Sequence, residues 1–260
     1  MFNYKYALLL FFISVFSISC TSENDENEDG EPGIDKTANL QGLGDSASHL
    51  LSDAEFTSMH IEIVYVNGYA PSQAALTNFK EFLMERTFKP DGIKISLRAV
   101  PSSGKAPFSI DEIVDIEEET RTIYNAGDEI AVYIYVADGK SEKDEENKFT
   151  LGSAFRNTSM VIFGETIENF AARANAPAES DIEAAVYNHE FGHLFGLVDI
   201  GTEPQSDHKD EDNEGHCIVD NCLMQSSIEF GSGIIDEIDG GRIPQLGEQC
   251  IRDLQAAGGR

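Results

Sequence analysis

Strand-like and helix-like segments alternate along the chain from residue 59 to residue 139, and this alternation constrains the fold more than any other feature. The strand-like segments are rich in β-branched and aromatic residues, whereas the helix-like segments carry apolar residues at helical spacing. Ser109 and Glu112 make a capping-box arrangement at the start of the second helix. The predicted strands are 60–68, 93–101 and 129–139, and the predicted helices are 71–88 and 109–127. This order predicts an α/β domain with a mostly parallel sheet.

Two shorter strands are predicted after a charged surface loop, at 149–157 and 159–164. One of them can run antiparallel at the edge of the sheet, where it would form the wall of a cleft. A helix is predicted from about Ser180 through residue 193, with acidic residues suited to its start, and a last helix is predicted over 246–257. The full expectation is therefore a twisted mixed sheet covered by helices.

The segment NHEFGHLFGLVD, from Asn188 to Asp199, places two histidines one helical turn apart. Both imidazoles, of His189 and His193, can therefore reach one metal ion. Glu190 lies beside them and can serve as the general base for a metal-activated water. Gly196 allows the helix to end in a left-handed turn, which redirects the chain so that a third ligand can return to the metal.

The pattern HExxHxxGxxD that begins at His189 resembles the active-site motif of the metzincin zinc endopeptidases, whose third ligand is histidine or, in the snapalysin branch, aspartate. Met224 lies downstream, where metzincins have a methionine turn beneath the metal. The spacing Cys217-x4-Cys222-x-Met224 is similar to that of the archaemetzincins. The resemblance covers residues 59–257 and implies a zincin fold with an antiparallel edge strand, an active-site helix, a methionine turn and a C-terminal helix.

Three residues compete for the position of third ligand. Asp199 holds the family position, and a carboxylate oxygen is an acceptable zinc ligand. His208 ranks next and His216 third, because zinc sites use imidazole more often than carboxylate. If Asp199 is not a ligand, it can instead orient a ligand histidine.

The remaining cysteines bear on the same region. In an oxidising setting, Cys217 and Cys222 are close enough in sequence to form a small disulfide loop before Met224, which leaves Cys250 unpaired or bonded to one of them. A second zinc site is the less favoured alternative, because thiolate sites are mostly a feature of reducing compartments.

The N-terminus has the pattern of an export signal. Residues 1–19 combine Lys5 with an apolar run too short to span a bilayer, and the run stops at Cys20, as at a bacterial lipoprotein cleavage site. An ordinary secretory signal is the alternative. Residues 20–48 are acidic and poor in large apolar side chains, so they predict a flexible tether, similar to the leaders of surface lipoproteins of Bacteroidetes. The catalytic domain is then expected over 49–260, on a lipoprotein at the outer membrane or cell surface.

The charge of the chain excludes several partners. With 47 acidic and 18 basic residues the formal net charge is −29, which argues against nucleic acid and against an anionic membrane surface. The acidic stretch 207–215 can alternatively bind calcium, although its spacing is not that of an EF-hand loop. We expect a monomer that acts on peptide or protein substrates.

These observations predict an exported zinc endopeptidase with one catalytic zinc ion, His189 and His193 as ligands, Glu190 as general base and Met224 as support. Two alternatives remain open: a metal-containing binding lipoprotein without turnover, and a zinc hydrolase of a non-peptide substrate. An extended peptide is expected to pair with the edge strand, within residues 149–157.

Overall fold

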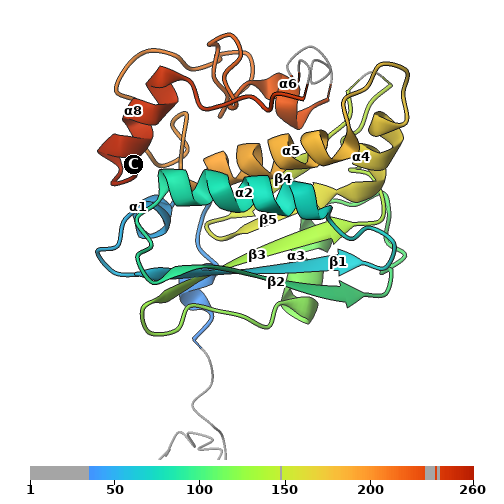
Figure 1. Cartoon of the computed structure of the whole chain (residues 1–260). Helices are drawn as coiled ribbons and strands as arrows, with labels where there is room; N and C mark the ends of the chain where they lie inside the picture. The colour runs from blue at the N-terminus through green and yellow to red at the C-terminus, as the bar shows by residue number, and fades with distance from the viewer. Residues whose placement is uncertain (1–34, 147, 232–237, 239–240) are drawn as a thin grey trace, which may run out of the picture. The chain divides into compact units, whose positions relative to one another are not determined.

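The computed structural model describes residues 35–260 except 147, 232–237 and 239–240 (Figure 1). Its strands are β1 (Ser58–Val66), β2 (Gly92–Val100), β3 (Glu129–Ala137), β4 (Gly152–Arg156) and β5 (Ser159–Phe163). Its helices are η1 (Thr37–Asn39), α1 (Ala47–Leu51), α2 (Gln73–Arg86), α3 (Ile110–Thr120), α4 (Gly164–Ala171), α5 (Glu179–Leu194), α6 (Ser226–Glu229) and α8 (Glu248–Ala256).

The strands form one five-stranded sheet in the order β2-β1-β3-β5-β4. Neighbouring strands are parallel throughout, except that β4 pairs antiparallel with β5 at one edge. The predicted fold class, a mixed sheet with an antiparallel edge strand, is confirmed. The antiparallel direction of β4 follows from its short connection to β5, since antiparallel neighbours can be joined by a tight turn whereas parallel neighbours need a crossover.

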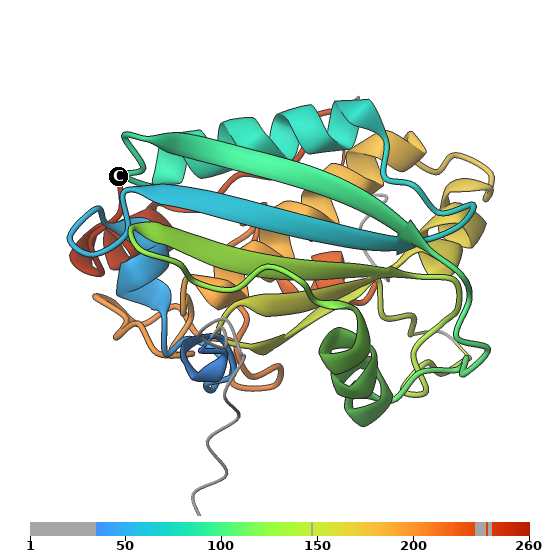
Figure 2. The same cartoon turned by 90° about the horizontal axis from the view of Figure 1, so that it is seen from below.

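Helices cover both faces of the sheet (Figures 1 and 2). The helices α2 and α5 lie on one face, and α3 lies on the other. Alternate side chains of β1 divide accordingly: Ile61 and Ile63 join the core under α2 and α5, whereas Val64 and Val66 join the smaller core that also holds Ile113 of α3. The central strand β3 is buried on both faces, which explains its nearly continuous apolar sequence.

The segment before β1 is part of the fold, and the prediction of a tether as far as residue 48 is wrong for the residues from 35 onward. The side chain of Asn39 is fully buried and donates hydrogen bonds to the Ala131 carbonyl and to the Asn125 side chain, at 3.0 and 2.7 Å. Leu50 and Leu51 of α1 are also buried. The predicted signal at 1–19 and the lipidation site Cys20 lie outside the described residues.

Among the described helices, none is long and apolar enough to cross a membrane.

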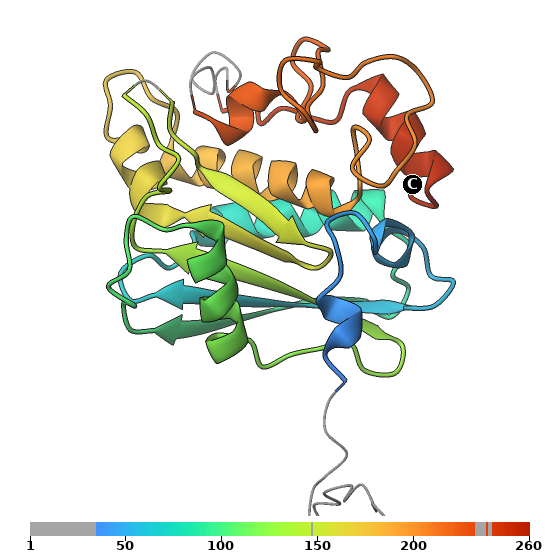
Figure 3. The same ribbon diagram turned by 180° about the vertical axis from the view of Figure 1, so that it is seen from behind.

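The chain beyond α5 forms a separate layer. It contains α6 and α8 and lies on the side of α5 that faces away from the sheet (Figures 1 and 3). The helix α5 is therefore packed between the sheet and this C-terminal segment, and its residues from Ile182 to Leu194 are buried. This placement lets residues far apart in the sequence approach the same turn of α5.

Candidate metal centre

The helix α5 brings the two motif histidines together. The Nε2 atoms of His189 and His193 lie 3.1 Å apart, and both side chains are buried. The Nδ1 atom of His189 lies 2.7 Å from the Leu223 carbonyl, which fixes the ring and leaves Nε2 free. This carbonyl lies beside Met224, whose sulfur packs on Gly192: a Cβ added at Gly192 would lie 2.3 Å from Met224 Sδ.

The third imidazole beside this pair is that of His216. Its ring stacks on His189 at a centroid distance of 5.3 Å and lies edge-on to His193 at 5.2 Å. Its Nδ1 atom contacts the Glu214 carbonyl at 3.0 Å, so that Nε2 faces the other two rings. Three imidazoles thus offer their Nε2 atoms to one point.

The structure thus brings His216, rather than Asp199 or His208, to the two α5 histidines. Gly196 ends the helix with a φ of 71°, as expected, but Val198 and Asp199 also adopt positive φ. This turn carries the Asp199 side chain to the surface, where it is half exposed and pairs with Lys209 at 2.5 Å. The chain returns to the helix only at His216, directly before Cys217, and the archaemetzincin-like spacing was the signal that could have placed this histidine first.

Glu190 points from α5 to the edge strand. Its Oε2 accepts a hydrogen bond from the Ala154 amide at 2.9 Å, and its Oε1 has no hydrogen-bond partner among the described residues. Gly152 makes room for this carboxyl group, because a Cβ there would lie 2.7 to 2.9 Å from the Glu190 side chain. Burial, followed by the negative charge of Glu229, raises the pKa of Glu190 well above its usual range.

The same burial keeps the two imidazoles of α5, those of His189 and His193, neutral. It lowers the pKa of His189 to about 4, and the neighbouring His216 adds to this effect. Burial, then His189 and His216, also holds the pKa of His193 well below its usual range. Neutral imidazole is the form that binds a metal ion.

A carboxylate that the sequence did not single out completes the group. Glu229, at the end of α6, places Oε2 at 2.7 Å from His216 Nε2 and 3.9 Å from His193 Nε2. The four ligand atoms of His189, His193, His216 and Glu229 all lie within 4.8 Å of one another. Nitrogen and carboxylate donors at this spacing suit zinc, and the two Nδ1 contacts to carbonyls are the supports that zinc-binding histidines usually have.

A second group of possible metal ligands lies in the C-terminal segment and includes His208. The Nδ1 atom of His208 lies 3.2 Å from the Cys217 sulfur and 3.9 Å from the Cys250 sulfur, and its Nε2 atom lies 2.7 Å from Asp253. The sulfurs of Cys222 and Cys250 are 3.6 Å apart. His208 therefore faces the thiols of Cys217 and Cys250 rather than the α5 histidines.

The three described cysteines are free, so the structure does not contain the predicted disulfide between Cys217 and Cys222. Hydrogen bonding among the thiols lowers the pKa of Cys222 and raises the pKa values of Cys217 and Cys250. Thiolates and an imidazole held by a carboxylate can bind a second metal ion.

The carboxylates of the acidic stretch 207–215 form no third group of possible metal ligands in the described structure. The Asp210 carboxylate accepts hydrogen bonds from the Asp212 and Asn213 amides within its own loop. Among the described residues, the two groups above are the ones with metal-ligand spacing, and neither contains a carboxylate of this stretch.

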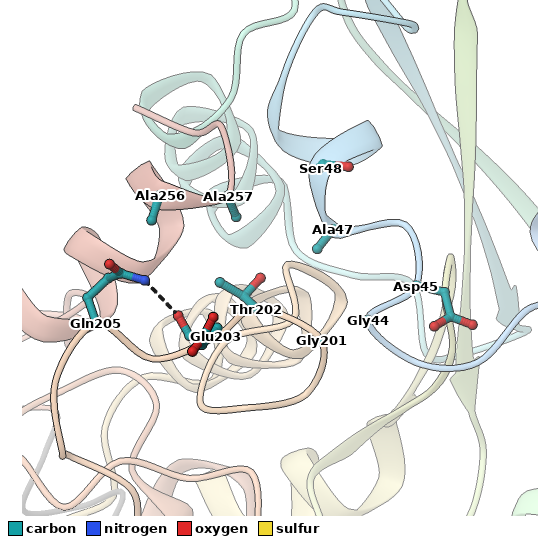
Figure 4. Close-up of a pocket in the computed structure, with 10 residues that line it drawn as sticks. All are labelled: Gly44, Asp45, Ala47, Ser48, Gly201, Thr202, Glu203, Gln205, Ala256 and Ala257. Atoms are coloured by element: carbon teal, nitrogen blue, oxygen red, sulfur yellow. Dashed lines mark hydrogen bonds between the residues drawn. The ribbon is translucent and has the colours of Figure 1, made fainter.

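One cavity of the described structure contains none of these candidate ligands. It has a volume of about 480 Å³ and lies between the N-terminal segment, the loop after α5 and the end of α8 (Figure 4). None of its lining residues is a candidate ligand. A cavity of about 430 Å³ does adjoin the metal centre, and Ser153 of β4, Glu229, Phe230 and Lys148 are among its lining residues.

The sheet with its antiparallel edge strand, crossed by a helix that carries two of three converging histidines, defines a metzincin-like fold. Among solved structures, the chain is similar to archaemetzincin from Methanopyrus kandleri, with a TM-score of 0.50 and 18% identity over 77% of this chain and 96% of that one. It also matches metalloproteinase-II from Bacteroides fragilis, with a TM-score of 0.42 and 12% identity over 80% of this chain and 55% of that one. No protein-family model and no curated protein matches the sequence.

Proposed function

We propose that the chain is a zinc-dependent endopeptidase, exported and tethered through its N-terminus. One observation carries this proposal: three imidazoles meet at one point, and the carboxyl group of Glu190, the residue after His189, is buried with a free oxygen. Zinc at this point would supply Lewis acidity, which polarises a peptide carbonyl and lowers the pKa of water. The residues that would hold it are His189, His193 and His216.

Glu190 is the proposed general base. Its Oε1 is unpartnered, whereas Oε2 is fixed by the Ala154 amide, so the group is oriented but retains a free acceptor for a proton. A raised pKa also suits it to return that proton to the leaving amine, since an acid–base catalyst works best when its pKa lies near the operating pH. Met224 supports the site from beneath through its contact with Gly192.

The substrate proposed is an extended peptide that lies along β4. The strand is at the edge of the sheet and contacts α5 through Glu190, so a peptide beside it would pass the metal centre. The adjoining cavity of about 430 Å³ is large enough to receive one substrate side chain.

A specific observation favours the alternative of a binding protein without turnover. The four-ligand set that includes Glu229 is closed, whereas catalytic zinc sites usually keep one position open. Glu190 favours the enzyme. Burying a carboxyl group costs free energy, and a binding protein gains nothing from such a group there.

The deciding comparison is the full chain against its Glu190→Gln variant, which keeps an oxygen for the Ala154 amide. We expect both proteins to retain zinc in the imidazole site and only the unsubstituted chain to cleave an unstructured protein, with a loss of about 100-fold or more in the variant. Full cleavage by Glu190→Gln would remove the general base from the proposal. Zinc in both proteins without cleavage in either would favour the binding protein.

A further inference from the structure

The end of α6 pairs with the chain that leads into the edge strand. The carbonyl of Glu229 accepts a hydrogen bond from the Leu151 amide at 2.8 Å, and the carbonyl of Phe230 accepts one from the Phe149 amide at 3.4 Å. Two alternate amides of the segment before β4 are thus bonded to successive carbonyls at the end of α6, and an added peptide strand would need these same amides. These amides lie within 149–157, the stretch expected to bind a peptide.

The same two residues also place side chains where a substrate would react. The Glu229 carboxylate lies 2.7 Å from His216 Nε2, and its side chain is only 15% exposed. The ring of Phe230 packs near His216 at 5.7 Å and lies under the Lys148 ammonium at 3.6 Å. Both residues line the cavity that adjoins the metal centre.

We propose that Glu229 and Phe230 form an internal pseudosubstrate, with the Glu229 carboxylate as a displaceable fourth metal ligand, so that the resting protein is self-inhibited. This inference rests on the proposed endopeptidase function. Glu229 and Phe230 occupy both the backbone position and the metal position that a peptide needs. A substrate must therefore displace them before it can pair with Phe149 and Leu151.

The effect on peptide affinity follows from the populations of two states. In the closed state Glu229 holds the fourth ligand position, and in the open state a peptide can bind. If about one molecule in ten is open at rest, then the apparent affinity for a peptide is reduced about tenfold, and removal of the carboxylate ligand restores it. A ligand that closes the site also raises the affinity for the metal, so the same substitution should weaken zinc binding by about tenfold or more.

The test compares the full chain with Glu229→Gln, which keeps the backbone and the side-chain shape but removes the anionic ligand. Glu142→Gln is the matched control, because it removes one charge from an exposed glutamate in the charged loop. Three quantities are measured: the visible absorption spectrum of the cobalt-substituted proteins, zinc affinity in competition with a chelator, and kcat/KM on an unstructured protein. The spectrum and the affinity do not depend on turnover.

We expect Glu229→Gln to change the cobalt spectrum, to lose zinc about tenfold more readily and to gain about tenfold in kcat/KM, with Glu142→Gln unchanged. An unchanged spectrum and affinity would overturn the ligand assignment, whatever the activity. A changed spectrum with lower kcat/KM would overturn self-inhibition and make Glu229 a participant in the reaction.

Inactivity of every variant would instead count against the proposed endopeptidase, while the spectrum would still decide whether Glu229 is a ligand. If Glu229→Gln fails to fold, Phe230→Ala provides a second route, since it removes the contacts with Lys148 and His216 and should also raise kcat/KM.

Discussion

At the scale of single residues, two glycines leave the space that the side chains of Met224 and Glu190 occupy in the candidate site. Gly192 admits the Met224 sulfur to the surface of α5, and Gly152 admits the Glu190 carboxyl group to the edge strand. Neither glycine has a positive φ, so its role is the space it leaves and not a backbone conformation. The histidine and glutamate positions of the motif were predictable from spacing alone, but these two close approaches were not, because they join residues distant in sequence.

The substitution Gly152→Ala tests whether the space at this glycine positions the Glu190 carboxyl group. In Gly152→Ala the new methyl group would lie 2.7 to 2.9 Å from Glu190, so the carboxyl group has to move away from the metal centre. We expect kcat to fall by about tenfold or more with KM and zinc content nearly unchanged, since a 1 Å misplacement at a reacting centre can cost 100-fold. Steady-state kinetics and metal analysis measure these quantities. An unchanged kcat would show that Glu190 does not need its present position.

At the scale of elements, the periodic segments were predictable and the irregular ones were not. The five strands and α5 followed from apolar patterning, and the Ser109 capping box of α3 is present. The helix α3 ends at Thr120 rather than near Gly127. The next residue, Arg121, leaves the helix, and its side chain donates hydrogen bonds to the buried Glu117 carboxylate and to the Ala131 carbonyl. The loop between α5 and α6 has no periodicity, so the return of His216 to the metal could not be derived from local pattern.

We expect the stability of that loop to depend on its own cluster of His208, Cys217 and Cys250. Because these three residues have metal-ligand spacing, we expect the full chain to bind two zinc ions, where the motif alone predicted one. Cys250→Ser should leave one ion and lower the melting temperature by several degrees, which corresponds to about 2 kcal/mol. Cys20→Ser, outside the cluster, should leave both ions.

Metal analysis and thermal unfolding measure both effects. One zinc ion in the unsubstituted chain, together with a disulfide between Cys222 and Cys250 in the mass spectrum, would contradict the second metal site. The 3.6 Å between these sulfurs makes that the competing outcome in an oxidising compartment.

At the scale of the whole molecule, charge is the dominant feature. Of the 47 acidic residues, six precede residue 35, so most of the net charge of −29 belongs to the folded part. A compact body with so large an excess of one sign is destabilised by self-repulsion. The sequence was sufficient for this conclusion, because net charge does not depend on how the chain folds.

Salt should therefore stabilise the protein. We expect the melting temperature to rise by about 3 °C or more between 10 mM and 500 mM sodium chloride, because the screening length falls from about 30 Å to a few Å over this range. Calcium chloride at equal ionic strength should add nothing, since the described acidic stretch 207–215 forms no ligand group. A melting temperature independent of sodium chloride would mean that the excess charge is already neutralised locally.

The first described element and the candidate metal centre lie on opposite sides of the sheet. Asp35 leads into η1, which lies on the same side of the sheet as α3, whereas the metal centre lies beyond α5 on the opposite side (Figures 1 and 3). The whole five-stranded sheet therefore separates the first described residues from the candidate metal ligands, so the two ends of this arrangement can be changed independently.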